Sequence, residues 1–112
     1  MTHDMTTIVQ PLNLLVSDEL DRASKIHGET FASPHEGFGV IAEEVQEVGD
    51  ELEIAEGNLS TMLAFIREGD SQRIADIADC LRDRAVNAAA EMIQVAAMCE
   101  KMTKTIKEEK HE

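Results

Sequence analysis

The chain has 112 residues, of which 43% are hydrophobic, and this is enough for one domain with a modest core. It holds three Phe and no Trp or Tyr, so aliphatic side chains and Met must fill that core, which favours packed helices over a β-sandwich. The formal charge is −13, with 23 acidic residues against 10 basic, and such a surface repels the phosphates of nucleic acids. We therefore expect a single all-α domain over residues 1–112 that does not bind nucleic acid.

Targeting signals and cysteines bear on where the protein works. No stretch near the start has the pattern of a signal peptide, and no apolar run approaches the roughly 20 residues of a membrane span. Cys80 and Cys99 fall in one expected helix, too far apart to bridge each other, and are predicted to be reduced core thiols. The sequence thus indicates a soluble, cytoplasmic protein that does not contact membranes.

The first expected helix covers about residues 11–27. Its apolar residues recur at spacings of three and four, as in Leu12, Leu15 and Leu20, and Gly28 is the expected stop. Residues 1–7 and 107–112 are polar or charged and are predicted to be frayed ends.

The second expected helix covers residues 34–68. Ser33 offers an N-cap hydroxyl, Pro34 suits the first helical position, and Glu36 stands at the capping-box position. A kink is allowed near Gly57, beyond which the apolar spacing continues. A turn with an N-cap over residues 69–71 opens the third helix, at about residues 72–106.

These helices are long for so short a chain. A helix of about 35 residues is about 50 Å long, whereas a compact domain of this size has a radius of gyration of only about 13 Å. A lone three-helix bundle would leave apolar stripes uncovered. We expect the bundle to be completed by a homodimer or a dimer of dimers.

Several carboxylates lie within or beside the apolar stripe of the second helix. At about 100° per residue the stripe gathers Val40, Ile41, Val45, Val48, Leu52, Ala55 and Leu59. Glu44 falls within it, and Glu47 and Glu51 lie on its margin. Buried carboxylates in a row repel each other, so a positive group is expected among them. The alternative is an acidic face exposed to solvent.

The third helix offers a matching set of oxygen ligands. Glu91 has Gln94 one turn after it and Asn87 one turn before it, and Asp83 continues the polar edge. Oxygen ligands from two helices suit Mg²⁺, or Mn²⁺, with positions left for water and phosphates. The alternative is that Glu91 and Gln94 only border the core.

His35 and Glu36 have simpler explanations than catalysis. Glu36 is explained by capping, because the first turn of a helix favours carboxylates. His35 is predicted to be a surface or packing residue.

Two segments of the chain carry a resemblance to a known family. The first runs Ser33-x-His35-Glu36-Gly37-Phe38 into Glu43-Glu44-x-x-Glu47, and the second is Ala90-Glu91-x-x-Gln94-Val95-Ala96-Ala97-Met98. With them the chain resembles the MazG-like all-α nucleotide pyrophosphohydrolases over about residues 12–103. It is most similar to the small phage-associated and bacterial members.

The resemblance implies a function and a site. It implies Mg²⁺-dependent hydrolysis of nucleoside triphosphates, or deoxynucleoside triphosphates, to the monophosphate and pyrophosphate. The implied metal ligands are Glu44, Glu47 and Glu91. Glu43 and Glu47 are the implied catalytic residues that orient or deprotonate the attacking water, and the alternative role for Glu43 is that of a further metal ligand. No residues for recognition of the base or sugar are assigned.

Two departures from the family pattern affect this interpretation. Gln94 stands where the family has Asp, so a neutral amide replaces one anionic ligand. The affinity for metal should therefore fall. Asp83 and Asn87 are candidates for a replacement ligand. The segment from 48 to 90 between the motifs is also longer than usual in the family. The alternative is therefore an oligomerisation or interaction protein of the same fold with weakened or lost catalysis.

Overall fold

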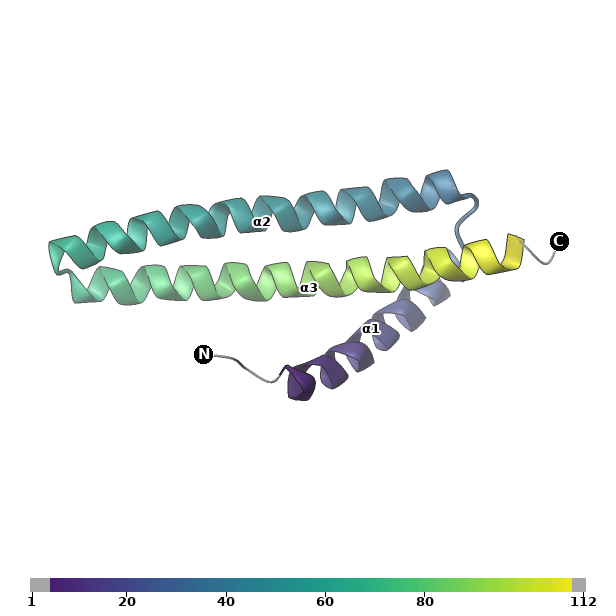
Figure 1. Ribbon diagram of the computed structural model, residues 1–112, viewed down its shortest axis with the longest axis horizontal. Helices are drawn as coiled ribbons and strands as arrows, with labels where there is room; N and C mark the ends of the chain where they lie inside the picture. Colours follow the sequence, from purple (N-terminus) through teal and green to yellow (C-terminus); the bar gives the residue numbers. More distant parts are fainter. Residues whose placement is uncertain (1–4, 110–112) are drawn as a thin grey trace. The chain divides into compact units, whose positions relative to one another are not determined.

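The structure is a computed structural model that describes residues 5–109, and three helices account for nearly all of them (Figure 1). Helix α1 spans Thr6–His27, α2 spans Pro34–Glu68 and α3 spans Ser71–Glu109. Residues 5–109 contain no strand, which confirms the predicted all-α fold. None of the helices in this range has the length and apolar content that a membrane crossing requires.

The helices extend further than the sequence predicts. Helix α1 begins at Thr6 and runs through Pro11, and α3 continues to Glu109. Residues 6–7 and 107–109 were expected to be frayed and are helical instead. Met5 forms a turn before α1, and the other residues of the expected frayed ends, 1–4 and 110–112, lie outside the described residues.

The ends of α2 have the expected local chemistry. The backbone N–H of Glu36 donates to the Ser33 Oγ at 3.1 Å, as an N-cap requires. The helix continues through Gly57 without a break. At its end, Gly69 has a φ of 72°, its N–H donates to the Ile66 carbonyl, and the Asp70 N–H donates to the Phe65 carbonyl. This pair of bonds is a Schellman motif, which stops α2 before α3 begins.

The described helices group into two compact units. The first unit comprises the chain up to Glu44 together with the residues from Met92 onward, and the second is Val45–Glu91. Because α2 and α3 are continuous helices, each contributes a segment to both units.

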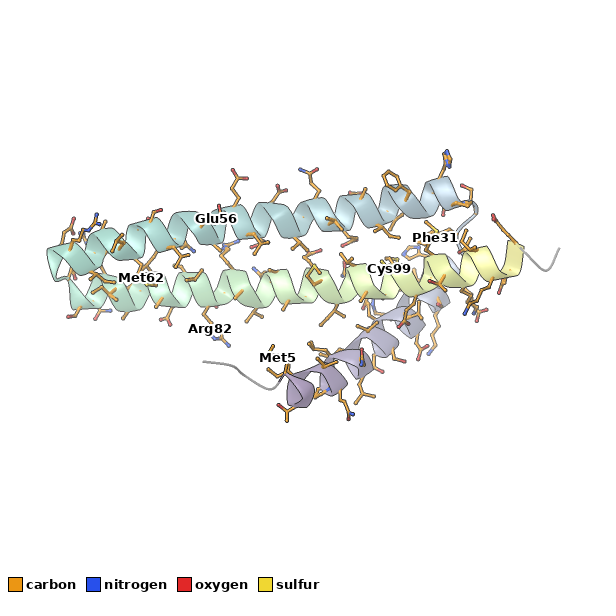
Figure 2. All side chains as sticks on the ribbon, in the orientation of Figure 1. Met5, Phe31, Glu56, Met62, Arg82 and Cys99 are labelled. Carbon is orange, nitrogen blue, oxygen red and sulfur yellow. The ribbon has the colours of Figure 1, made fainter. Side chains whose placement is uncertain are left out.

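The second unit is an antiparallel helical hairpin (Figure 1). The residues that are at least partly buried recur every three or four positions and form one narrow seam: Val48, Glu51, Ala55, Asn58, Met62 and Phe65 on α2, and Ile74, Ile77, Leu81, Arg84, Ala88 and Glu91 on α3. Apart from Asp70 in the turn, the other residues of this unit are exposed; Arg82, for example, points away from α2 (Figure 2). The hairpin therefore buries one line of side chains per helix and leaves the rest in solvent.

The seam corrects the predicted apolar stripes. Val45, Leu52 and Leu59 were placed on one buried face with Val48 and Ala55, yet they are about half exposed. On α3, Ala85 and Met92 are apolar and lie four residues after Leu81 and Ala88 of the seam, yet both are exposed. A two-helix seam is only one residue wide, so neighbouring apolar lines of the same helix remain uncovered.

The first unit has a small core around the loop after α1. Its buried residues are Val16, Ala23, Phe31, Gly37, Ala97, Lys101 and Thr105. Phe31 lies beside α3 (Figure 2), where its N–H donates to the Thr105 Oγ1 at 2.9 Å. The Thr105 hydroxyl in turn donates to the Lys101 carbonyl at 2.8 Å. One buried hydroxyl thus ties the loop to α3.

Candidate metal centre

Three acidic side chains of α2 and α3 come together. Glu47 and Glu91 belong to the second unit, and Glu44 lies one turn before Glu47 on the continuous helix α2. One carboxylate oxygen of each residue lies within 4.8 Å of the corresponding oxygens of the other two. The structure thus brings together the three residues that the sequence predicted as metal ligands.

Two oxygens of this group have no hydrogen-bond partner among the described residues. The Oε2 atoms of Glu44 and Glu91 are inaccessible to solvent and have no hydrogen-bond partner among the described residues. A buried carboxylate oxygen without a hydrogen-bond partner is unfavourable by several kcal/mol. Both oxygens are therefore suited to binding a cation.

The donor set matches a hard divalent ion. Mg²⁺ takes oxygen ligands at about 2.0–2.1 Å, so two ligands of one ion are at most about 4.2 Å apart. One carboxylate oxygen each of Glu44, Glu47 and Glu91 lies within 4.8 Å of the others, an upper bound close to this limit. The three residues therefore fit Mg²⁺, and they leave positions for water and phosphate oxygens.

Glu51, the other carboxylate predicted at the margin of the apolar stripe of α2, has a cationic partner. Glu51 lies two turns after Glu44, and its Oε2 accepts a hydrogen bond from Arg84 at 3.3 Å. Both side chains lie on the seam of the hairpin. The positive group expected among the carboxylates is therefore Arg84, and it neutralises Glu51.

The other predicted site residues lie apart from this group. Glu43 is exposed on α2. Asn87 is exposed on α3, and the exposed Asp83 pairs with its neighbour Arg82 at 3.3 Å. Gln94 is partly buried and lines a pocket of the first unit together with Glu44. Asp83 is thus directed to an arginine and not to the three glutamates.

Two further sequence expectations can be compared with the structure. His35 is exposed at the start of α2, as expected for a surface residue. Cys80 and Cys99 are free thiols as predicted, but both are exposed, so their assignment to the core is wrong. Each cysteine lies one residue away from a partly buried position, which is Leu81 on the seam for Cys80 and Met98 in the first unit for Cys99.

Comparisons with known proteins give no counterpart. No family model, curated protein or solved structure matches this chain. The site is therefore interpreted from its own residues.

Sequence reasoning missed two cations that the structure places on buried faces. Arg84 follows Ile77 and Leu81 at helical spacing, so a signal for its position on the seam was present. Lys101 is four residues after the buried Ala97 and four before the buried Thr105. Both positions were missed because charged residues are normally expected to be exposed.

Proposed function

We propose that the protein is a Mg²⁺-dependent nucleotide pyrophosphohydrolase, which converts a nucleoside or deoxynucleoside triphosphate and water to the monophosphate and pyrophosphate. The observation that carries the proposal is the convergence of Glu44, Glu47 and Glu91, with two oxygens inaccessible to solvent and without partners. The resemblance of the two motifs to MazG-like enzymes supplies the reaction.

The proposed roles follow from position. Glu44, Glu47 and Glu91 hold Mg²⁺, or Mn²⁺ in its place. When bound, the ion supplies neutralisation of the triphosphate charge and lowers the pKa of water. This explains how a chain with a formal charge of −13 accepts a polyanionic substrate.

The protein side chains then handle the proton. Glu47 accepts a proton from the water that attacks the α-phosphorus, and Glu43, which is exposed on α2, orients that water. The bond from the α-phosphorus to the bridging oxygen breaks, and its electron pair leaves with pyrophosphate. We place this activity in the cytoplasm, where free thiols such as Cys80 and Cys99 stay reduced.

Replacing one ligand tests the proposal. We expect Glu44→Gln to release pyrophosphate from a nucleotide panel at least about tenfold more slowly than wild type with Mg²⁺ or Mn²⁺. The reason is that even substitutions next to metal ligands cost about 10–100-fold in metal affinity or activity. Glu56→Gln removes the same charge from an exposed position of α2 and should leave the rate unchanged. Equal rates for Glu44→Gln and wild type would remove the assignment.

We also propose that the protein is a homodimer or a dimer of dimers. Val45, Leu52, Leu59 and Ile66 repeat every seven residues along the second unit, and with Leu63 they are 46% to 55% exposed. A heptad ladder of aliphatic side chains is the pattern that a helix presents to another helix. A second copy offers the same ladder and satisfies two-fold symmetry.

The molecular mass of the protein in solution tests whether the ladder is an interface between copies. We expect the double substitution Leu52→Lys with Leu59→Lys to convert the oligomer to monomers in sedimentation equilibrium, because two buried charges would face the partner copy. The matched control, Gln46→Lys with Ser60→Lys, adds the same charges at exposed positions off the ladder and should keep the oligomer. A Leu52/Leu59 variant with the wild-type mass would contradict this interface.

The same ladder favours a second candidate function. A helical oligomerisation or interaction protein needs the ladder but no chemistry, and Gln94 in place of an acidic ligand is consistent with lost catalysis. This candidate predicts no effect of Mg²⁺ on thermal stability, whereas the enzyme requires one.

A further inference from the structure

The first unit contains a pocket of about 410 Å³ that no role above explains. Residues of α1, the loop after it, α2 and α3 line it, and its polar members include Glu19, Arg22, Glu36, Glu44, Gln94 and Lys101. Its apolar wall includes Met98 and Val40 on two different helices. The pocket is large enough for a small organic molecule and has both polar and apolar lining.

Lys101 is the unusual member of this lining. Its residue is only 4% exposed, and its Nζ lies 4.5 Å from the centre of the Phe31 ring. The ion pairs among the described residues do not include Lys101. An ammonium that is removed from water and forms no ion pair is unfavourable, and contact with an aromatic ring compensates only part of that loss.

Arg22, the other permanently charged cation of the pocket, already has its partner. Arg22 Nε donates to Glu19 at 2.9 Å, and this hydrogen bond, with the charge of Arg22, holds the pKa of Glu19 below its ordinary value. Lys104, one turn from Lys101, pairs with Glu29 at 3.0 Å. Lys101 is thus the pocket cation that remains available to an incoming anion.

We propose that this pocket binds a phosphorylated small molecule, with a phosphate group on Lys101 and the organic part against Met98 and Val40. The choice of phosphate, and not another anion, rests on the proposed function. Glu44 lines the same pocket, and Lys101 lies about 10 Å further along α3 than Gln94 at 1.5 Å per residue. Lys101 then contributes the protein's own positive charge to a substrate that the acidic residues cannot attract.

Binding of pyrophosphate with EDTA present tests this without metal or turnover. We expect calorimetry to show binding to wild type and at least tenfold weaker binding to Lys101→Met, which keeps the length and apolar stem of the side chain. Lys104→Met removes the same charge from the same helix outside the pocket and should bind as wild type does. Equal affinities for the two variants would overturn the proposal.

A second measurement uses the wild-type protein and so does not depend on correct folding of the Lys101 variant. In the amide NMR spectrum of the wild-type protein, pyrophosphate should shift resonances of Phe31, Met98 and Lys101 selectively. Shifts that avoid these residues would contradict the site.

The Glu91→Gln variant separates the two proposals. Glu91 does not line the pocket, so this variant should bind pyrophosphate in EDTA like wild type even if nucleotide hydrolysis is absent. Loss of pyrophosphate binding in Glu91→Gln would count against an independent phosphate site on Lys101.

Discussion

Gly37→Ala should destabilise the protein by about 1–3 kcal/mol, the usual effect of overpacking a core. A Cβ on Gly37 would lie 2.5 Å from the Met102 Cε and 2.7 Å from the Phe31 Cδ2. The Met102 methyl group can swing away. The Phe31 ring cannot move alone, because its residue is held by the hydrogen bond to Thr105 and its ring by Lys101.

Gly39 provides the matched control in the same turn of α2. A Cβ at Gly39 meets no atom within 4 Å, so Gly39→Ala should stabilise by about 0.5–1 kcal/mol through helix propensity. Thermal unfolding followed by circular dichroism measures both. At roughly 4–8 °C per kcal/mol for a domain of about this size, the two variants should melt on opposite sides of wild type. Coincident melting curves would show that α2 does not approach Phe31 this closely.

Mg²⁺ should stabilise wild type and not Glu91→Gln. A ligand at a hundred times its Kd raises the free energy of unfolding by about 2.7 kcal/mol. Without metal, Glu91→Gln should be at least as stable as wild type, because the substitution relieves repulsion among carboxylates that lie within 4.8 Å.

Thermal unfolding with and without millimolar Mg²⁺ measures this difference. Glu56→Gln, an exposed substitution on α2, should keep the full Mg²⁺ shift. A wild-type protein indifferent to Mg²⁺ would favour the non-catalytic helical assembly. A shift of equal size in Glu91→Gln would place the metal elsewhere.

The sequence predicts the helices well because their ends are encoded locally. Ser33 supplies a cap hydroxyl, and Gly69 supplies the left-handed backbone that ends α2. These signals act within a few residues and do not depend on packing. The start of α1 was misplaced because proline is normally expected in the first turn, whereas Pro11 lies further inside.

The buried faces are harder to predict because hydrophobicity does not say what covers a side chain. Leu52 and Ala55 are both apolar, yet Ala55 lies on the seam with α3 and Leu52 is half exposed. The converse holds for Lys101, which only the tertiary placement of Phe31 can bury. The candidate ligands Glu44, Glu47 and Glu91 were identified from the motifs, but their convergence depends on the register of the two helices, which sequence does not provide.

We propose that Glu44, Glu47 and Glu91 bind the metal that serves nucleotide hydrolysis. A crystal structure with Mn²⁺ and a non-hydrolysable nucleoside triphosphate, with anomalous scattering to locate the metal, tests it most directly. We predict an anomalous peak bonded to oxygens of all three residues at close to the Mg²⁺ distance of about 2.1 Å, with phosphate oxygens completing the coordination. Nucleotide bound without a peak at these glutamates, or metal held by other residues, would contradict the claim.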